Sequence, residues 1–145
     1  MVSIFDVAKY ILEERGRMST WKLQKLCYYA QAWHFTWTGE RLIKEKFEAW
    51  MNGPVCPPLY RAHVGKFSVT TGDIFRGNPQ KLNDDESESV DVVLKDYGDK
   101  DPYELKEMTH AEDPWRDARG DLPEDAKCTR EITLESMKKY YSRRL

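Results

Sequence analysis

The sequence predicts a mainly α-helical protein: a compact, single-domain helical bundle around a central buried helix at about residues 20–37, with a small β element near residues 42–55. Three observations lead to this prediction. Capping residues and glycine stops bracket several segments with a helical spacing of apolar residues. Residues 22–40, KLQKLCYYAQAWHFTWTGE, are apolar on more than one helical face, which is typical of a buried helix. The β-like runs are too short for more than a small ribbon.

The first predicted helix covers residues 4–15. Ser3 is a favourable N-cap, Asp6 suits the positive end of the helix dipole, and Gly16 is a natural stop. The central helix follows at about residues 21–37, capped by Ser19 or Thr20 and ended by Gly39.

The middle of the chain predicts the small β element. Residues 42–43 and 47–50 are β-like, and Gly53-Pro54 is a turn signal. Because Pro57-Pro58 should bar a regular helix before Leu59, we expect a short helix at about residues 59–66.

The C-terminal half predicts three further helical pieces and a last helix. Residues 76–89 read as a polar loop whose acidic end opens a helix reaching Tyr97. Asp101-Pro102 and Asp113-Pro114 each place a capping Asp before a proline at the first helical position. Thr133 caps the last helix, whose inward residues are Leu134, Met137, Tyr140 and Tyr141.

The central helix is expected to have two faces with different roles. The face of Leu23, Leu26, Ala30 and Trp33 should be core. The Tyr28 side should lie partly open beside a Trp50–Tyr60 turn and form a shallow aromatic groove for a partner.

Composition argues for a soluble, folded protein in the cytoplasm. The net charge is -2, which provides no field for general attraction to nucleic acid or an anionic membrane. No apolar run approaches the roughly 20 residues of a membrane span. Cys27, Cys56 and Cys128 fit no disulfide framework and read as reduced thiols.

Catalysis and metal binding have weak support. Cys27 and His34 are seven residues apart, as are Cys56 and His63, so neither pair chelates a metal within one helix. His110 and Glu112 resemble an acid–base pair, but bracing of the Asp113-Pro114 turn explains them better. We therefore predict no enzyme, no metal and no cofactor.

Three segments carry a resemblance to a known family: KLQKLCYYAQ at residues 22–31, FEAWMNGPVCPPLY at residues 47–60 and, more weakly, THAEDPW at residues 109–115. They resemble the Panacea domain, the SocA-like family of antitoxins and phage-associated proteins. With its flanks, the resemblance spans the chain, so residues 1–145 would be one such domain. It implies a helical protein that neutralises a toxin encoded beside it by direct binding.

Two alternatives stay open. One branch of the family acts as a proteolytic adaptor that delivers its toxin to a ClpXP-type AAA+ protease. A phage-derived nucleic-acid-binding regulator is less favoured, because the cations in MKKYYSRRL also suit a helix C-terminus. The residues predicted to bind the partner are Gln24, Tyr28, Tyr29, Gln31, Trp50, Pro54 and Tyr60.

Overall fold

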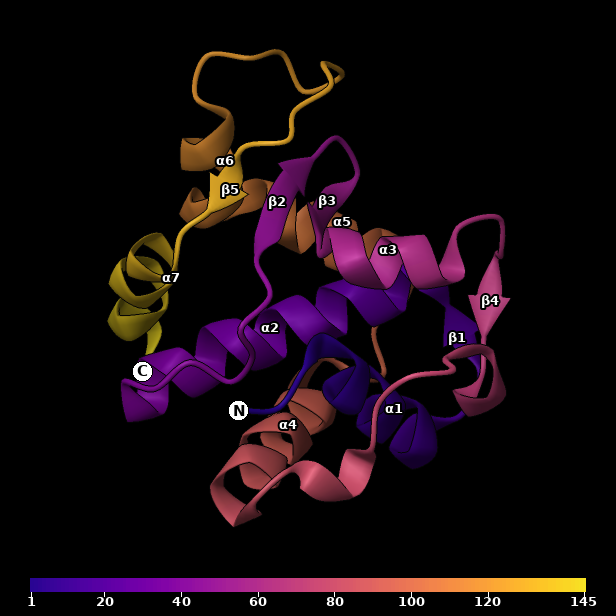
Figure 1. The fold of residues 1–145 in the computed structure, drawn as a ribbon. Coiled ribbons are helices and arrows are strands. Elements are labelled where there is room, and N and C mark those ends of the chain that lie inside the picture. Colours follow the sequence, from indigo (N-terminus) through magenta and orange to yellow (C-terminus); the bar gives the residue numbers. More distant parts are fainter.

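A computed structural model describes residues 1–145 and contains seven helices. Six of them are arranged around the second helix of the chain (Figure 1). In chain order, the helices are α1 (Ile4–Arg15), α2 (Thr20–Thr38), α3 (Pro57–His63), α4 (Asp84–Tyr97), α5 (Pro102–Ala111), α6 (Asp113–Arg119) and α7 (Leu134–Tyr141). The strands are β1 (Met18–Ser19), β2 (Phe47–Trp50), β3 (Gly53–Val55), β4 (Ser68–Val69) and β5 (Glu131–Ile132). Three short 3-10 turns are η1 (Thr71–Asp73), η2 (Pro79–Lys81) and η3 (Ser142–Arg144).

Helix α2 forms the centre of the molecule, as predicted. It runs between α1 and α4 on one side and β2, β3, α3 and α5 on the other, while α7 lies along its C-terminal part (Figure 1). Thirteen of its 19 residues are buried, including Leu23 and Leu26 on one face and Tyr28 on the other. Ser19 caps it by accepting a hydrogen bond from Lys22 N, and Gly39 ends it in the left-handed conformation.

The predicted β element forms a three-stranded antiparallel sheet. Strand β2 pairs with β3 through a tight turn, with Trp50 opposite Gly53, and with β5 on its other edge. Ile43 makes only an isolated bridge to Val2. The two-residue strands β1, β4 and β5 were not predicted, because segments of that length carry no periodicity that can be recognised.

Two helix starts differ from the sequence prediction. Helix α3 begins at Pro57 rather than Leu59, since prolines at the first two helical positions remove no intrahelical hydrogen bond. Helix α4, by contrast, begins at Asp84, and the acidic end of residues 76–89 forms its first turn, as predicted. Glu112, not Asp113, occupies the N-cap position of α6, because α5 ends at that same residue.

The remaining caps follow the prediction. Ser3 and Asp6 form a capping box on α1, and Asp101 and Glu104 form another on α5. Thr133 caps α7, which buries Met137, Tyr140 and Tyr141. None of the helices combines the length and the apolar character needed to cross a membrane.

Candidate interaction surface

The seven residues predicted to bind a partner divide into a buried group and a surface group. Gln24 and Gln31 belong to the buried group and hold backbone of their own chain. The Gln31 side chain accepts from Leu42 N at 2.8 Å and donates to Ile43 O at 3.1 Å. Gln24 likewise accepts from Cys56 N at 2.8 Å, so the two amides fasten α2 to the segments around the β element.

Tyr28 is also buried, and the expectation that its side lies partly open is wrong. Its side chain is 1% exposed, packed edge-on against Phe47, with its hydroxyl 3.2 Å from that of Tyr141. Tyr29 is fully buried and stacks on Tyr97 with ring centroids 4.1 Å apart. The physical reason is that α7 folds back over α2 and delivers Tyr141, a contact across more than 100 residues that local periodicity does not reveal.

Glu112 organises this tyrosine cluster. Its carboxylate accepts hydrogen bonds from the hydroxyls of Tyr29 at 2.8 Å and Tyr141 at 2.7 Å. Burial raises the pKa of Glu112, although the two hydroxyl donors oppose that shift. Glu112 therefore ties α2, α7 and the α5–α6 junction together, which agrees with the bracing role expected for the THAEDPW segment.

His110 and the cysteines occupy packing positions. The His110 ring stacks on Trp115 with centroids 3.8 Å apart, and its Nε2 is buried without a hydrogen-bond partner. All three cysteines are buried as free thiols, and no three His, Cys, Asp or Glu side chains meet in a metal-ligating group.

Trp50 and Tyr60 form the surface group, and the structure brings them together as expected. Their rings meet edge-on with centroids 4.9 Å apart, and both side chains are half-buried. The Trp50 indole donates to Glu48 at 2.8 Å, while its carbonyl accepts from Trp115. Pro54, by contrast, is buried in β3 opposite Ala49.

The β2–β3 turn extends this aromatic area into a larger one. Two hollows, of about 320 and 240 Å³, lie on either side of Trp21 and Asn52, which line both. Met51 lines the first and is 43% exposed, while Tyr103 lines the second and is 68% exposed. We call the set formed by Trp21, Trp50, Met51, Asn52 and Tyr103 the turn surface.

Of the five members of the turn surface, only Trp50 is among the residues that the sequence predicts to bind a partner. Trp21 stands at the start of the central helix, and Met51 and Asn52 directly precede the Gly53-Pro54 turn signal. A residue next to a predicted tight turn is normally exposed, so an apolar Met51 was a usable signal. The sequence around Tyr103 contains no such signal. Its neighbours on the surface, Trp21 and Asn52, come from α2 and the β2–β3 turn, which are distant in the sequence.

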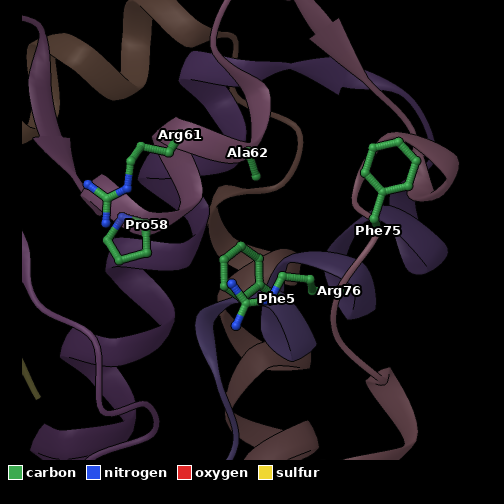
Figure 2. Close-up of a pocket in the computed structure, with 6 residues that line it drawn as sticks. All are labelled: Phe5, Pro58, Arg61, Ala62, Phe75 and Arg76. Atoms are coloured by element: carbon green, nitrogen blue, oxygen red, sulfur yellow. The ribbon is translucent and has the colours of Figure 1, made fainter.

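A third hollow, the Phe–Arg groove, lies between α1, α3 and the loop after η1 (Figure 2). It has a volume of about 320 Å³ and is lined by Phe5, Pro58, Arg61, Ala62, Phe75 and Arg76. Arg76 lies across the ring of Phe5 at 4.6 Å, whereas Phe75 projects from the loop and is 91% exposed (Figure 2). The groove combines an apolar floor with two exposed cations from distant segments.

Comparison with known proteins identifies the family. Residues 23–116, more than half of the chain, match the family described as "Antitoxin SocA-like, Panacea domain". The chain belongs to this family. No curated protein and no solved structure gives a significant match.

The Panacea match begins inside α2 and ends inside α6. It includes the β2–β3 turn, Tyr103 and most of the Phe–Arg groove. Helices α1 and α7 lie outside it, yet both contribute to the single core cluster of 33 buried residues. In this chain the Panacea segment is therefore packed together with its flanking helices.

Proposed function

We propose that this Panacea domain is an antitoxin that neutralises a cognate toxin by direct contact, without catalysis. Family membership is the main support. The toxin would be the product of a neighbouring gene, and both proteins would act in the cytoplasm, where three buried thiols remain reduced.

The turn surface is the part of the molecule best suited to this contact. It gathers two half-buried tryptophans, an exposed tyrosine and an exposed methionine on one side of the β2–β3 turn. Aromatic and methionine side chains are enriched at the centres of protein–protein interfaces, and the rigid aromatic rings bury a large area at a small entropic cost. Of the seven predicted residues, Trp50 and Tyr60 are proposed to touch the toxin. The buried five would hold the surface in shape.

The first test is co-expression with the adjacent open reading frame. The protein should restore the growth of cells that express the toxic product of that reading frame. The two purified proteins should form a complex in the absence of any protease. Met51→Asp and Tyr103→Ala should each weaken that complex more than tenfold, as hot-spot changes do. Phe75→Ala removes an even more exposed aromatic ring, in the Phe–Arg groove; it is the control and should leave binding unchanged.

The opposite effects of these variants would place the toxin-binding site elsewhere. If Phe75→Ala abolishes binding and Met51→Asp does not, the toxin docks at the Phe–Arg groove. If growth is rescued without any detectable complex at micromolar concentrations, direct neutralisation is wrong.

Delivery of the toxin to a AAA+ protease is the second candidate, favoured by the presence of two separate surfaces. An adaptor must hold its cargo and its protease at once, and the turn surface and the Phe–Arg groove share no residue. In that case Phe75→Ala should leave toxin binding intact but slow toxin degradation by ClpXP.

Nucleic-acid binding has less support. Lys138 lies over Phe35, and Arg143 lies within 3.6 Å of Asp113, so cations near the C-terminus already have partners in the chain. A gel-shift series is the test, because binding driven by phosphate contacts weakens steeply as salt rises.

A further inference from the structure

Lys25 is a buried cation without a counter-charge. The residue is 1% exposed, and its side chain forms no ion pair. Its ammonium is not among the fully enclosed polar atoms that lack a partner, so the tip of the side chain still reaches the surface. The face of Trp21, 5.5 Å from the ammonium, is its one favourable electrostatic contact. Buried lysines are normally paired, because removing an ammonium from water costs several kcal/mol. An isolated one needs an explanation.

The surroundings of Lys25 are positive. Burial lowers the pKa of Lys25 to about 8, and the nearby Lys106 lowers it in the same direction. No carboxylate acts on Lys25 strongly enough to raise its pKa. Both lysines also help to lower the pKa of His110. At neutral pH the ammonium is still mostly charged, so an unneutralised positive charge remains under the surface.

The side chain of Lys25 is held in place and lines an opening. Its stem runs beneath the β2–β3 turn, so close that a Cβ on Gly53 would lie 2.9 Å from Lys25 Cε and 3.3 Å from Thr109 Oγ1. Beyond it lies the smaller hollow of the turn surface, about 240 Å³ in volume. We call this hollow the Lys25 pocket; its lining is Trp21, Lys25, Asn52, Pro102, Tyr103 and Lys106.

We propose that the Lys25 pocket binds a carboxylate side chain of the protein partner, with the Lys25 ammonium as its counter-charge. This inference rests on the proposed function, since it names the group through which the toxin would enter the turn surface. The partner's carboxylate would complete an ion pair in a place from which water is largely excluded, where such a pair is strong. Trp21 and Tyr103 would cover the methylene stem of the incoming Asp or Glu.

The donor set favours a carboxylate over a phosphate. Phosphate sites are typically built from arginine forks or from free backbone amides at a helix N-terminus. The Lys25 pocket contains no arginine. The nearby start of α5 is already capped, because Asp101 accepts a hydrogen bond from Glu104 N. Two lysines around a small hollow match one carboxylate.

The first experiment uses small probes and does not involve a toxin. Acetyl-glutamate methylamide, whose one charge is the side-chain carboxylate, is titrated at constant ionic strength into isotopically labelled protein. The NMR signals of the Lys25 ammonium and of the Asn52 and Tyr103 amides should shift, and the pKa of Lys25 should rise. Acetyl-glutamine methylamide is the neutral control and should produce no shift.

Variants define the site. Lys25→Met should weaken binding of the glutamate probe at least tenfold while melting no lower than the wild type, because it replaces a buried charge with an apolar chain of similar length. Lys22→Met, one turn earlier on α2 and outside the pocket, should bind the probe like the wild type. Equal shifts with both probes, or no change at Lys25, would overturn the inference. Tighter binding of inorganic phosphate would overturn the choice of carboxylate.

The second experiment separates this inference from the proposed function. If Lys25→Met also weakens the toxin complex at least tenfold, both stand. If toxin binding is unchanged in Lys25→Met, the pocket is not used by the partner and the inference fails, while the antitoxin proposal survives. If the glutamate probe binds but the neighbouring gene product does not, the pocket stands and the antitoxin proposal fails.

Discussion

At the scale of single residues, Glu112 is the most informative side chain of the core. It is the shared acceptor for the hydroxyls of Tyr29 and Tyr141. Glu112→Ala should lower the free energy of unfolding by about 1–3 kcal/mol, because two buried hydroxyls lose their acceptor. Glu112→Gln should cost less, since its amide oxygen still accepts, and it should neutralise toxin like the wild type. Denaturant unfolding and the co-expression assay measure the two effects. Loss of neutralisation in a Glu112→Gln protein that folds and binds normally would revive a catalytic role.

The pH dependence of stability provides a second readout of Glu112. Because burial raises its pKa, the folded state binds the proton more tightly than the unfolded state does. This contribution to stability is fully present below the ordinary pKa of 4.5 and is lost as pH rises through the higher folded value. The stability of the wild type relative to Glu112→Gln should therefore fall as pH rises above that point. A relative stability that rises instead would mean that the tyrosine donors outweigh burial.

Tyr28 illustrates how burial changes the expected effect of a substitution. Tyr28→Ala should lower the free energy of unfolding by about 3–5 kcal/mol, comparable to the roughly 2–5 kcal/mol expected for Leu26→Ala, because both side chains are fully buried. Tyr28→Phe, which loses only the contact with the Tyr141 hydroxyl, should cost about 0.5–1.5 kcal/mol. Thermal or denaturant melts of the three variants test this, and a mild Tyr28→Ala would contradict the burial.

At the scale of elements, the β2–β3 turn depends on its glycine for two separate reasons. Gly53 has φ +122, which strains any other residue, and an added Cβ would lie 2.9 Å from Lys25 Cε. Gly53→Ala should therefore destabilise the protein by more than the roughly 1–3 kcal/mol of backbone strain alone. Gly65→Ala is the control, since Gly65 has φ +85 and open space around it. In a Lys25→Ala background, the cost of Gly53→Ala should fall toward that of Gly65→Ala. An unchanged cost would show that the lysine stem yields easily.

Local sequence patterns could predict some of these elements and not others. Helix α1 and the caps of α2 could be predicted because Ser3, Ser19 and Gly39 act within one turn of the backbone. The start of α3 was misjudged because a proline stops a helix only when the backbone before it is already helical. The closeness of Trp50 and Tyr60 was predictable from a tight turn between them. The burial of Tyr28 was not, since it depends on α7 arriving from the other end of the chain.

At the scale of the whole molecule, the segments that resemble the Panacea family and the complete core do not coincide. The motifs correctly indicated the family and the central helix, but they did not reveal which of their residues face inward. A side chain such as Gln24 or Tyr29 has the same chemistry whether it holds its own chain or a partner. The packing of α1, α4 and α7 around α2 decides between these two roles. That packing depends on contacts between residues far apart in the sequence.

The matched segment should therefore be unable to fold without its flanks. A protein limited to residues 23–116 lacks α1 and α7, whose buried side chains include Ile4, Val7, Ile11, Leu12, Met137 and Tyr141. Losing both helices uncovers two sides of α2, and a core reduced to that extent falls below the few kcal/mol by which domains of this size are stable. We expect no cooperative thermal transition and little dispersion of NMR signals from this fragment.

A chain ending at residue 141 is the control. It loses only the exposed residues of η3 and Leu145, and it should melt cooperatively near the temperature of the full chain. A cooperative melt of the 23–116 fragment would show that the matched segment contains a complete core, and that α1 and α7 only cover it.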